Sequence, residues 1–291
     1  DWSSDVCSSD LNIKLCICVS LLNRLHKYIQ ADYSIMLRKI VFLILFYGAF
    51  NSNAQTVGLI SNTNATDGYV LFAPNTGTIT YLIDKCGYKV HSWTSTHQPG
   101  QSAYLLDDGS LLRSGRINNP ALNGGGLGGI IEKFDWAGNI TWSFTISSSM
   151  QSQHHDIYPL PNGNILAIVW EIKTPAEAIA QGRNPSLLGT NLWSEKIIEI
   201  QPSGLNSATV VWEWHVWDHL IQSLDSTKLN YGTPSAHPEL IDAAGDHRVL
   251  PLFWNHMNSI DYNPTLDQIV VSVRGNSEIW VIDHKIGRAH V

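Results

Sequence analysis

Apolar and polar residues alternate in short runs along most of the chain, and the runs come in pairs separated by a polar turn. Pairs of this kind occupy residues 103–116, 156–170 and 259–274. An alternation with a period of two predicts half-buried strands, and a turn of Asp, Asn and Gly residues between two strands predicts a hairpin. Further strand pairs follow the same pattern at residues 78–93, 128–144 and 194–214, and a last strand is predicted at residues 277–283. The sequence therefore predicts an all-β protein made of repeated units.

The repeated unit has four strands and recurs at roughly fifty residues, which is typical of the blades of a β-propeller. Trp93, Trp142 and Trp212 fall at equivalent places in their units. A β-sandwich is the alternative, although a sandwich does not require a hairpin and a tryptophan-ending strand in every unit. We therefore predict a β-propeller of which about four blades are present.

Two segments interrupt the repeat. Residues 216–251 are too long for a turn, and we expect them to form a lid or a loop at the rim. Residues 174–185 begin with PAEAIA after a threonine, which predicts one or two helical turns.

The two ends of the chain do not follow the pattern. Residues 1–11 and 286–291 resemble translated sequencing adapter, because one DNA element read in two orientations encodes both. Residues 36–55 have Arg and Lys, then an apolar run, then small residues, which is typical of a secretory signal peptide. We interpret residues 12–35 as read-through of untranslated DNA. The folded domain is therefore expected at residues 56–285, with export to the periplasm or the cell exterior.

The amino-acid composition and the net charge exclude some classes of binding partner. The formal net charge of -7 argues against a nucleic-acid partner, and no basic run indicates an anionic membrane surface. The apolar run at residues 40–50 is too short for a stable membrane span. With the ends set aside, Cys86 is the one remaining cysteine, so we expect no intramolecular disulfide.

The hairpin at residues 259–274 carries polar groups at one end. The start of its first strand and the end of its second strand share one rim of the sheet, so His256, Asn258 and Arg274 are expected to lie together. His256 and Asn258 are two apart and should point to the same face. Each residue also has a structural interpretation, in which His256 only borders a solvated channel and Arg274 pairs with Asp283 or Glu278.

Equivalent positions in other hairpins are polar too. Counted from the turn, His155 and Gln101 match Asn258, and Arg116 matches Arg274. His154, the neighbour of His155, is expected to face the other way. Because the innermost strands of a propeller surround its axis, these groups should converge on one pocket. The pattern predicts an anion-binding active site.

Other motifs are weaker. His215 and His219 are four apart, the spacing of metal ligands on one helical face, but no glutamate of the metalloprotease type lies between them and a strand-like run precedes them. We expect no metal site there, and interpret Trp217 and Leu220 as anchors of the lid. The glycine-rich residues 124–129 lack a GKS/T ending, so we expect a loop over the pocket and no phosphate loop.

Three stretches together resemble the arylsulfotransferase family, the bacterial aryl-sulfate sulfotransferases that use no nucleotide sulfate donor. They are QHHDIYPLPNGNILAIVWE, EWHVWDHL and WNHMNSIDYNPTLDQIVVSVR. The resemblance implies a six-bladed propeller that moves a sulfuryl group from a phenolic ester to another phenol without a cofactor or a metal. It also implies His256 and Arg274 as catalytic residues that bind sulfate, with Asn258 beside them. One histidine of the HHD motif is implied as well, and the alternation favours His155.

Further substrate contacts are expected from the same site. Arg116, His154 and His219 are predicted to bind the substrate, and Trp170 and Trp254 are predicted to hold aryl rings at the rim. The resemblance implies a histidine nucleophile in a later blade and ping-pong kinetics. No residue of this chain matches that nucleophile, so the chain as given is expected to be inactive. The alternatives are a propeller sulfatase or esterase that uses water, and a binding propeller without catalysis.

Overall fold

The computed structural model describes residues 65–245, 253–287 and 289–290. The predicted signal peptide at residues 36–55, the segment before it and the first adapter-like stretch lie outside these residues. The described residues divide into two compact units. One holds residues 65–70 and 83–90, and the other holds residues 71–82, 91–245, 253–287 and 289–290. In the first unit the Asp84 side chain accepts hydrogen bonds from the backbone N–H groups of Cys86 and Tyr88. Cys86 is disulfide-bonded, which corrects the expectation that it has no partner.

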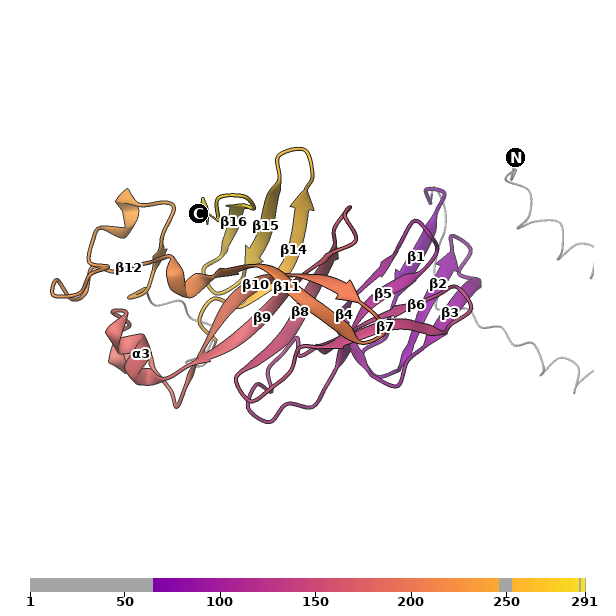
Figure 1. Ribbon diagram of the computed structural model, residues 1–291, viewed down its shortest axis with the longest axis horizontal. Coiled ribbons are helices and arrows are strands. Elements are labelled where there is room, and N and C mark those ends of the chain that lie inside the picture. The colour runs from indigo at the N-terminus through magenta and orange to yellow at the C-terminus, as the bar shows by residue number, and fades with distance from the viewer. Residues whose placement is uncertain (1–64, 246–252, 288, 291) are drawn as a thin grey trace, which may run out of the picture. The chain divides into compact units, whose positions relative to one another are not determined.

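The chain folds into antiparallel sheets whose strands follow one another in sequence order (Figure 1). The first sheet has three strands, β1 Tyr69–Phe72, β2 Ile79–Asp84 and β3 Lys89–Thr94. The second has β4 Pro99–Leu105, β5 Leu111–Arg116, β6 Gly129–Phe134 and β7 Ile140–Thr145. The third has β8 Gln151–Pro159, β9 Ile165–Lys173, β10 Leu192–Ser203 and β11 Ser207–His215. The fourth has β14 Met257–Asn263, β15 Gln268–Val273, β16 Glu278–Asp283 and β17 Ala289–His290.

These elements confirm the all-β prediction and the predicted hairpins. The propeller and its number of blades stay a prediction. The short strand β17 lies inside residues 286–291, which we had set aside as adapter, and pairs with β16.

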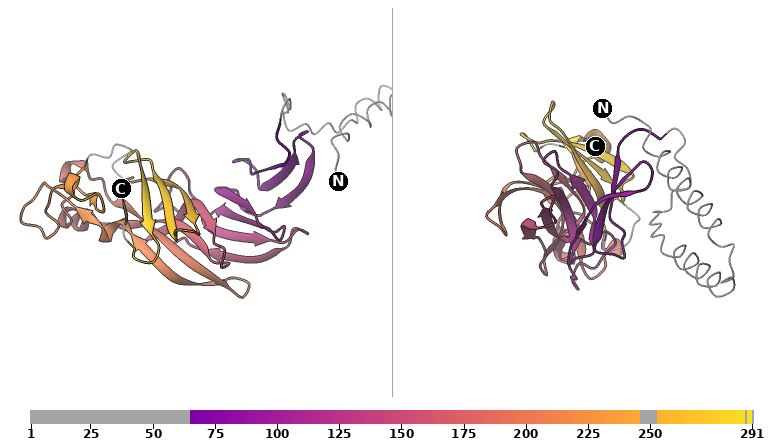
Figure 2. Two further views of the ribbon diagram at one scale, coloured as in Figure 1. Left: turned by 90° about the horizontal axis from the view of Figure 1, so that it is seen from above. Right: turned by 90° about the vertical axis from the view of Figure 1, so that its right-hand side faces the viewer.

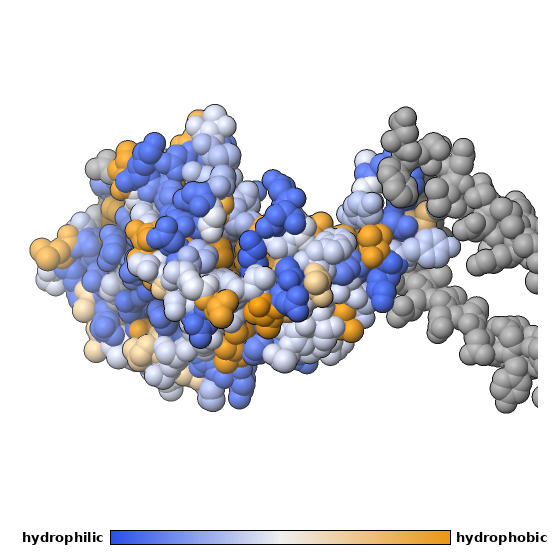
Figure 3. Space-filling view, turned by 45° about the vertical axis from the view of Figure 1, so that its right-hand side comes forward, coloured by the Kyte–Doolittle hydropathy of each residue, from blue (hydrophilic) through white to orange (hydrophobic). Residues whose placement is uncertain are grey.

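The second, third and fourth sheets lie next to one another through their first strands (Figure 2). β8 contacts both β4 and β14, so the second, third and fourth sheets meet along their first strands. One cluster of buried apolar residues joins the third and fourth sheets through β9, β10, β14, β15 and β16. A second cluster joins the second and third sheets. On the face shown in Figure 3, apolar side chains occur in small groups between polar ones. The exposed ones include Ile140, Val210 and Val211, which lie on the last strands of their sheets.

A tryptophan on the last strand of a sheet bonds to a turn of the next sheet. The indole N–H of Trp93 donates to the Asp135 carbonyl, and that of Trp142 donates to the Ser207 carbonyl, both at 2.9 Å. In the third sheet the equivalent bond is made by Trp214, which donates to Gly287 at 2.9 Å. The expected equivalent was Trp212, which instead packs edge-on against His284.

The two interruptions of the repeat have structures of their own. Helix α3, Pro175–Ala180, confirms the predicted helical turns, and it begins with a capping box between Thr174 and Glu177. The 3-10 turn η1, Pro185–Leu187, follows it. Residues 216–245 contain the 3-10 turns η2 Val216–Asp218 and η3 Pro234–Ala236 and the parallel pair β12 Leu220–Ile221 and β13 Ile241–Asp242. Arg183 connects the two segments, since its guanidinium donates to the carbonyls of Ala243 and Gly245.

Candidate functional site

Each of the three adjoining first strands bulges near its beginning. The register with the second strand breaks between Pro99 and Ala103 in β4, and between Gln153 and Ile157 in β8. In β14 it breaks between Met257 and Ser259. A bulge re-aims the side chains that it contains, and it is found next to active sites. Gln101, His155 and Asn258 lie inside these three bulges.

The bulged backbones are unusual in conformation. Gln101, His155 and His256 have positive φ angles of 84°, 49° and 56°. Few residues other than glycine adopt this region, and such residues gather at ligand-binding sites. Three neighbouring sheets therefore each hold a residue in an unfavourable backbone conformation near the start of the first strand.

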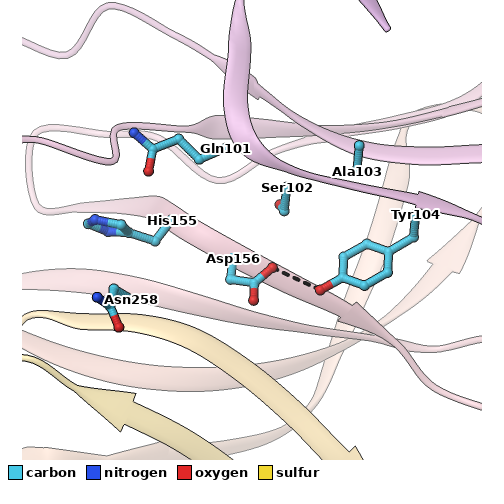
Figure 4. A pocket seen from close by; sticks show the side chains of 7 residues that line it. All are labelled: Gln101, Ser102, Ala103, Tyr104, His155, Asp156 and Asn258. Atoms are coloured by element: carbon cyan, nitrogen blue, oxygen red, sulfur yellow. Dashed lines mark hydrogen bonds between the residues drawn. The ribbon is translucent and has the colours of Figure 1, made fainter. Parts of the chain in front are cut away.

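Gln101, His155 and Asn258 line one cavity of about 330 Å³ (Figure 4). Their side chains lie beside one another on β4, β8 and β14, and the alignment of the hairpins predicted that the three would lie together. Ser102, Ala103, Tyr104 and Asp156 complete the lining. The lining is polar on all three strands, which suits a small polar or anionic group more than a lipid.

Asp156 holds the floor of the cavity together. Its Oδ1 accepts from the Tyr104 hydroxyl at 3.0 Å and from the Ile157 N–H at 2.9 Å, and its Oδ2 accepts from the Ile260 N–H at 3.1 Å. Burial raises the pKa of the Asp156 carboxyl, and the hydrogen bonds oppose that rise. Burial and the neighbouring Asp156 raise the pKa of Tyr104, so its hydroxyl keeps the proton that it donates. Sequence reasoning missed both residues, although Asp156 belongs to the HHD motif.

Two arginines lie at equivalent places at the ends of their hairpins. The backbone of Arg274 pairs with that of His256, and the backbone of Arg116 pairs with that of Gln98, so the two arginines are equivalent in their hairpins. Burial lowers the pKa of both His155 and His256, and the positive charge of Arg274 adds to the lowering. Neither arginine forms an ion pair within the part of the chain that the structure describes, so Arg274 does not pair with Asp283 or Glu278.

The histidines form a chain that leads from the interior to the cavity. The Nδ1 atoms of His154 and His155 are 2.9 Å apart, a hydrogen-bond distance. The His155 and His256 rings meet edge to face with centroids 4.8 Å apart. Burial lowers the pKa of His155 to about 4, and it also lowers the pKa of His256. Both rings are therefore neutral near pH 7, and each presents one N–H and one lone pair.

His154 is fully buried and does not turn fully away from its neighbour, because the bulge at residues 154–156 breaks the strand alternation. Its ring stacks on Trp170 with centroids 4.0 Å apart and an interplanar angle of 7°. Burial, followed by His155 and His256, holds the pKa of His154 well below its usual range. His154 is therefore a neutral residue within hydrogen-bond distance of His155. It does not line the cavity, which corrects the prediction that it binds the substrate.

Trp170 and Trp254 are not at the rim as expected, since each is 1% exposed. Trp170 packs with Trp193 and Phe253 beneath the histidines. Trp254 packs against Trp217 and receives the Arg183 guanidinium on its ring face. Trp170 lies on β9 and Trp254 lies in the bend before β14, and both indoles are buried among core residues.

His219 also takes a different place. It stacks on Trp214 with centroids 4.8 Å apart, and burial lowers its pKa. His215 pairs with Glu171 and Glu213, so the two histidines of the HVWDHL stretch do not share a partner. In residues 65–245 and 253–287 no group of three or more His, Cys, Asp and Glu side chains is arranged to hold a metal ion.

The glycine-rich loop runs along the start of β8, beside the site. The carbonyl of Gly126 accepts the backbone N–H of His155 at 2.6 Å, and Leu127 bridges to His154. Gly126 has a φ of +85°, and a Cβ built on it would overlap the His155 ring. The absence of a side chain at Gly126 therefore lets the loop lie against that ring. That the loop covers the pocket stays a prediction.

A family comparison accounts for this combination of residues. The profile of the family described as "Arylsulfotransferase (ASST)" matches residues 51–288. The chain belongs to the arylsulfotransferase family. No curated protein matches the chain in sequence.

Two solved structures are similar over half of their length. One is a protein of unknown function from Bacteroides caccae, with 11% identity and a TM-score of 0.40, over 75% of this chain and 54% of that chain. The other is hydrazine synthase from Kuenenia stuttgartiensis, with 15% identity and a TM-score of 0.42, over 75% of this chain and 49% of that chain. The arylsulfotransferase chain thus spans about half of each.

Proposed function

We propose that this arylsulfotransferase moves a sulfuryl group from a phenolic sulfate ester to a phenol, with the group held between His155, His256 and Arg274. The observation that supports the proposal is the convergence of three bulged first strands on one polar cavity. Arg274, at the end of the hairpin that carries Asn258, forms no ion pair with the residues that the structure describes. The sheets would then be blades of a β-propeller, and residues 36–55 would export the protein.

The chemistry fits these residue types. In sulfuryl transfer, as in phosphoryl transfer, charge lies on the peripheral oxygens and on the departing phenolate. Fixed donors that face this charge stabilise the transition state. Arg274 supplies a permanent positive charge and a planar set of N–H donors. Asn258 and Gln101 add neutral amide donors that bind the oxygens without closing an ion pair.

The neutral histidines serve a second purpose. An imidazole N–H of His155 or His256 donates to a sulfuryl oxygen or protonates the departing phenolate. A charged imidazolium is disfavoured in this buried site, so the anion is held mainly by Arg274 and by neutral donors. The covalent step of a ping-pong reaction would use a further histidine outside these 291 residues.

The test uses the protein expressed from the complete reading frame, with p-nitrophenyl sulfate as the donor. Release of p-nitrophenol is followed with and without phenol. Sustained release that requires phenol is expected, and Arg274→Ala should lower kcat by about 10²-fold or more. His215→Ala is the control, because His215 pairs with Glu171 and Glu213 away from the cavity.

Other outcomes point to other functions. Sustained release without phenol would replace the transferase by a hydrolase that uses water. Silence with and without phenol, combined with no calorimetric binding of the ester, would overturn the aryl-sulfate assignment. If no p-nitrophenol is released but the ester binds tightly, and Arg274→Ala abolishes that binding, the chain is a binding protein with the same site.

A further inference from the structure

A carboxyl group lies directly behind the buried histidine. Glu195, on β10, is 1% exposed, and its Oε1 is 3.9 Å from the Nε2 of His154. Oε1 also accepts the backbone N–H of Met257 at 2.8 Å, which fixes the carboxyl beside the strand that begins after His256. Glu195 therefore touches both histidine-bearing strands from the interior.

Two buried polar atoms of this pair of side chains have no hydrogen bond among the described residues. They are Nε2 of His154 and Oε2 of Glu195. A buried polar atom without a partner is costly, so such atoms are rare and call for a specific explanation. A proton on Glu195 that is donated to His154 Nε2 would satisfy both atoms after a small rotation of the carboxyl, whose last torsion is soft.

The surroundings favour a protonated Glu195. Burial raises its pKa to about 8, and the N–H groups of Met257 and His256 and the Trp170 side chain only partly oppose the rise. No charged side chain is among the groups that shift it, and its titratable neighbour is His154. A neutral acid next to a neutral imidazole avoids the large cost of burying a charge.

We propose that Glu195 is a proton reservoir for the sulfuryl-transfer site and acts on the cavity through His154 and His155. This inference rests on the proposed function. In the resting state Glu195 donates to His154 Nε2, the Nδ1–H of His154 donates to His155 Nδ1, and the Nε2–H of His155 faces the cavity.

The proton moves in one direction when the ester breaks. As the sulfur–oxygen bond breaks, sulfur forms its new bond to the nucleophile of the proposed ping-pong reaction. The phenolate oxygen keeps the electrons of the broken bond and takes the Nε2 proton of His155. His155 then takes the Nδ1 proton of His154 on its own Nδ1, and His154 takes the proton of Glu195 on Nε2. Glu195 ends as a carboxylate, so one proton has crossed and no ring has become charged.

This arrangement predicts a dependence on the leaving group. Phenolate is a strong base and needs the proton, whereas p-nitrophenolate is a weak base and leaves without it. Glu195→Gln keeps the size and a donor for His154 but cannot release a proton. In the complete protein, Glu195→Gln should lower kcat for phenyl sulfate by about 10²-fold, within the range of general acid catalysis. It should change kcat for p-nitrophenyl sulfate by less than about threefold, as expected of a step without general acid catalysis.

A purely structural role would lower kcat for both esters equally, and that result would overturn the proposal. Glu171→Gln is the matched control, since Glu171 is a half-buried carboxylate on β9 that pairs with Lys173 and His215. It should leave the ratio of the two rates unchanged. Wild-type protein that turns over neither ester would instead count against the proposed function.

A second measurement decides the proton arrangement without activity. In wild-type protein labelled with ¹⁵N-histidine, NMR should show His154 protonated on Nδ1 and accepting a hydrogen bond on Nε2. His154 protonated on Nε2 would overturn the proposal, whatever the rates are. A shift of the His154 Nε2 resonance in Glu195→Gln, without a change in Glu171→Gln, would assign the partner.

Discussion

Glu195 and His154 show how a single buried proton links the stability of this fold to pH. In the folded state burial raises the pKa of Glu195 to about 8 from an ordinary 4.5. Between these pH values the unfolded chain has released the proton while the folded chain keeps it. The free energy of unfolding therefore falls as pH rises through this window.

Glu195→Gln should remove that contribution. The difference in unfolding free energy between wild type and variant should be largest near pH 5 and shrink as pH approaches 8, by at most about 1.4 kcal/mol per pH unit. Urea denaturation at pH 5, 6, 7 and 8 measures the difference, and effects of other titrating groups cancel in it. If the plots of unfolding free energy against pH ran parallel for wild type and variant, Glu195 would ionise in the folded state as it does in water.

The residues of the site were predictable from the sequence to different extents. His155, Gln101 and Asn258 were found because they lie at equal distances from their turns, and the cavity contains all three. Glu195 was missed, although a glutamate within the apolar run of β10 is an unusual residue on a buried strand. Its relation to His154 and Met257 depends on packing between sheets, which no local pattern reports.

At the scale of elements, the glycine-rich loop and β8 are fitted to each other at Gly126. A side chain there is disfavoured for two reasons, the positive φ and the overlap with the His155 ring. Gly126→Ala should displace that ring and weaken binding of p-nitrophenyl sulfate by about tenfold, equal to about 1.4 kcal/mol. Isothermal titration calorimetry measures the effect.

Two glycines serve as controls for this variant. Gly125→Ala meets no atom within 4 Å and has no positive φ, so its affinity should equal that of wild type. Gly138→Ala has a φ of +90° but open space around it, so it carries the backbone strain without the overlap. Equal losses of affinity in Gly126→Ala and Gly138→Ala would show that general strain, not the ring of His155, is responsible.

The hairpins followed from the sequence because alternation and turn residues are local signals. The bulges did not, since the three-residue excursions at 100–102 and 154–156 disturb the very alternation that was counted. The same disturbance explains the position of His154. Strand alternation predicted that His154 points away from His155, but in the bulge the two rings lie at hydrogen-bond distance. Trp170 and Trp254 were misplaced because pattern alone does not tell a rim from a core.

At the scale of the whole molecule, tryptophan bonds join one sheet to the turn of the next. Trp142 is 5% exposed and donates to Ser207 in the following sheet. Trp142→Phe keeps a ring but leaves the carbonyl of Ser207 without this donor. The expected loss of stability is about 1 to 3 kcal/mol. Urea denaturation followed by circular dichroism measures this loss. Trp136→Phe is the control, because its indole is 47% exposed, and it should lower the unfolding free energy by less than about 0.5 kcal/mol.

Asp156 joins three sheets at one point, because it lies on β8 and binds the Tyr104 hydroxyl from β4 and the Ile260 N–H from β14. Asp156→Asn retains one oxygen and directs an NH₂ group toward a partner that is also a donor. One buried donor is then left unsatisfied, so the unfolding free energy should fall by about 1 to 3 kcal/mol.

Asp107→Asn is the matched control, since Asp107 is exposed in the turn after β4.

The position of Asp156 predicts a second effect, because the three strands that it connects carry Gln101, His155 and Asn258. Loss of the tie should loosen the cavity as well as the fold, and ester binding should weaken in Asp156→Asn at temperatures where the variant is still folded. A variant that loses stability but binds the ester as wild type does would show that the three sheets hold the cavity without Asp156.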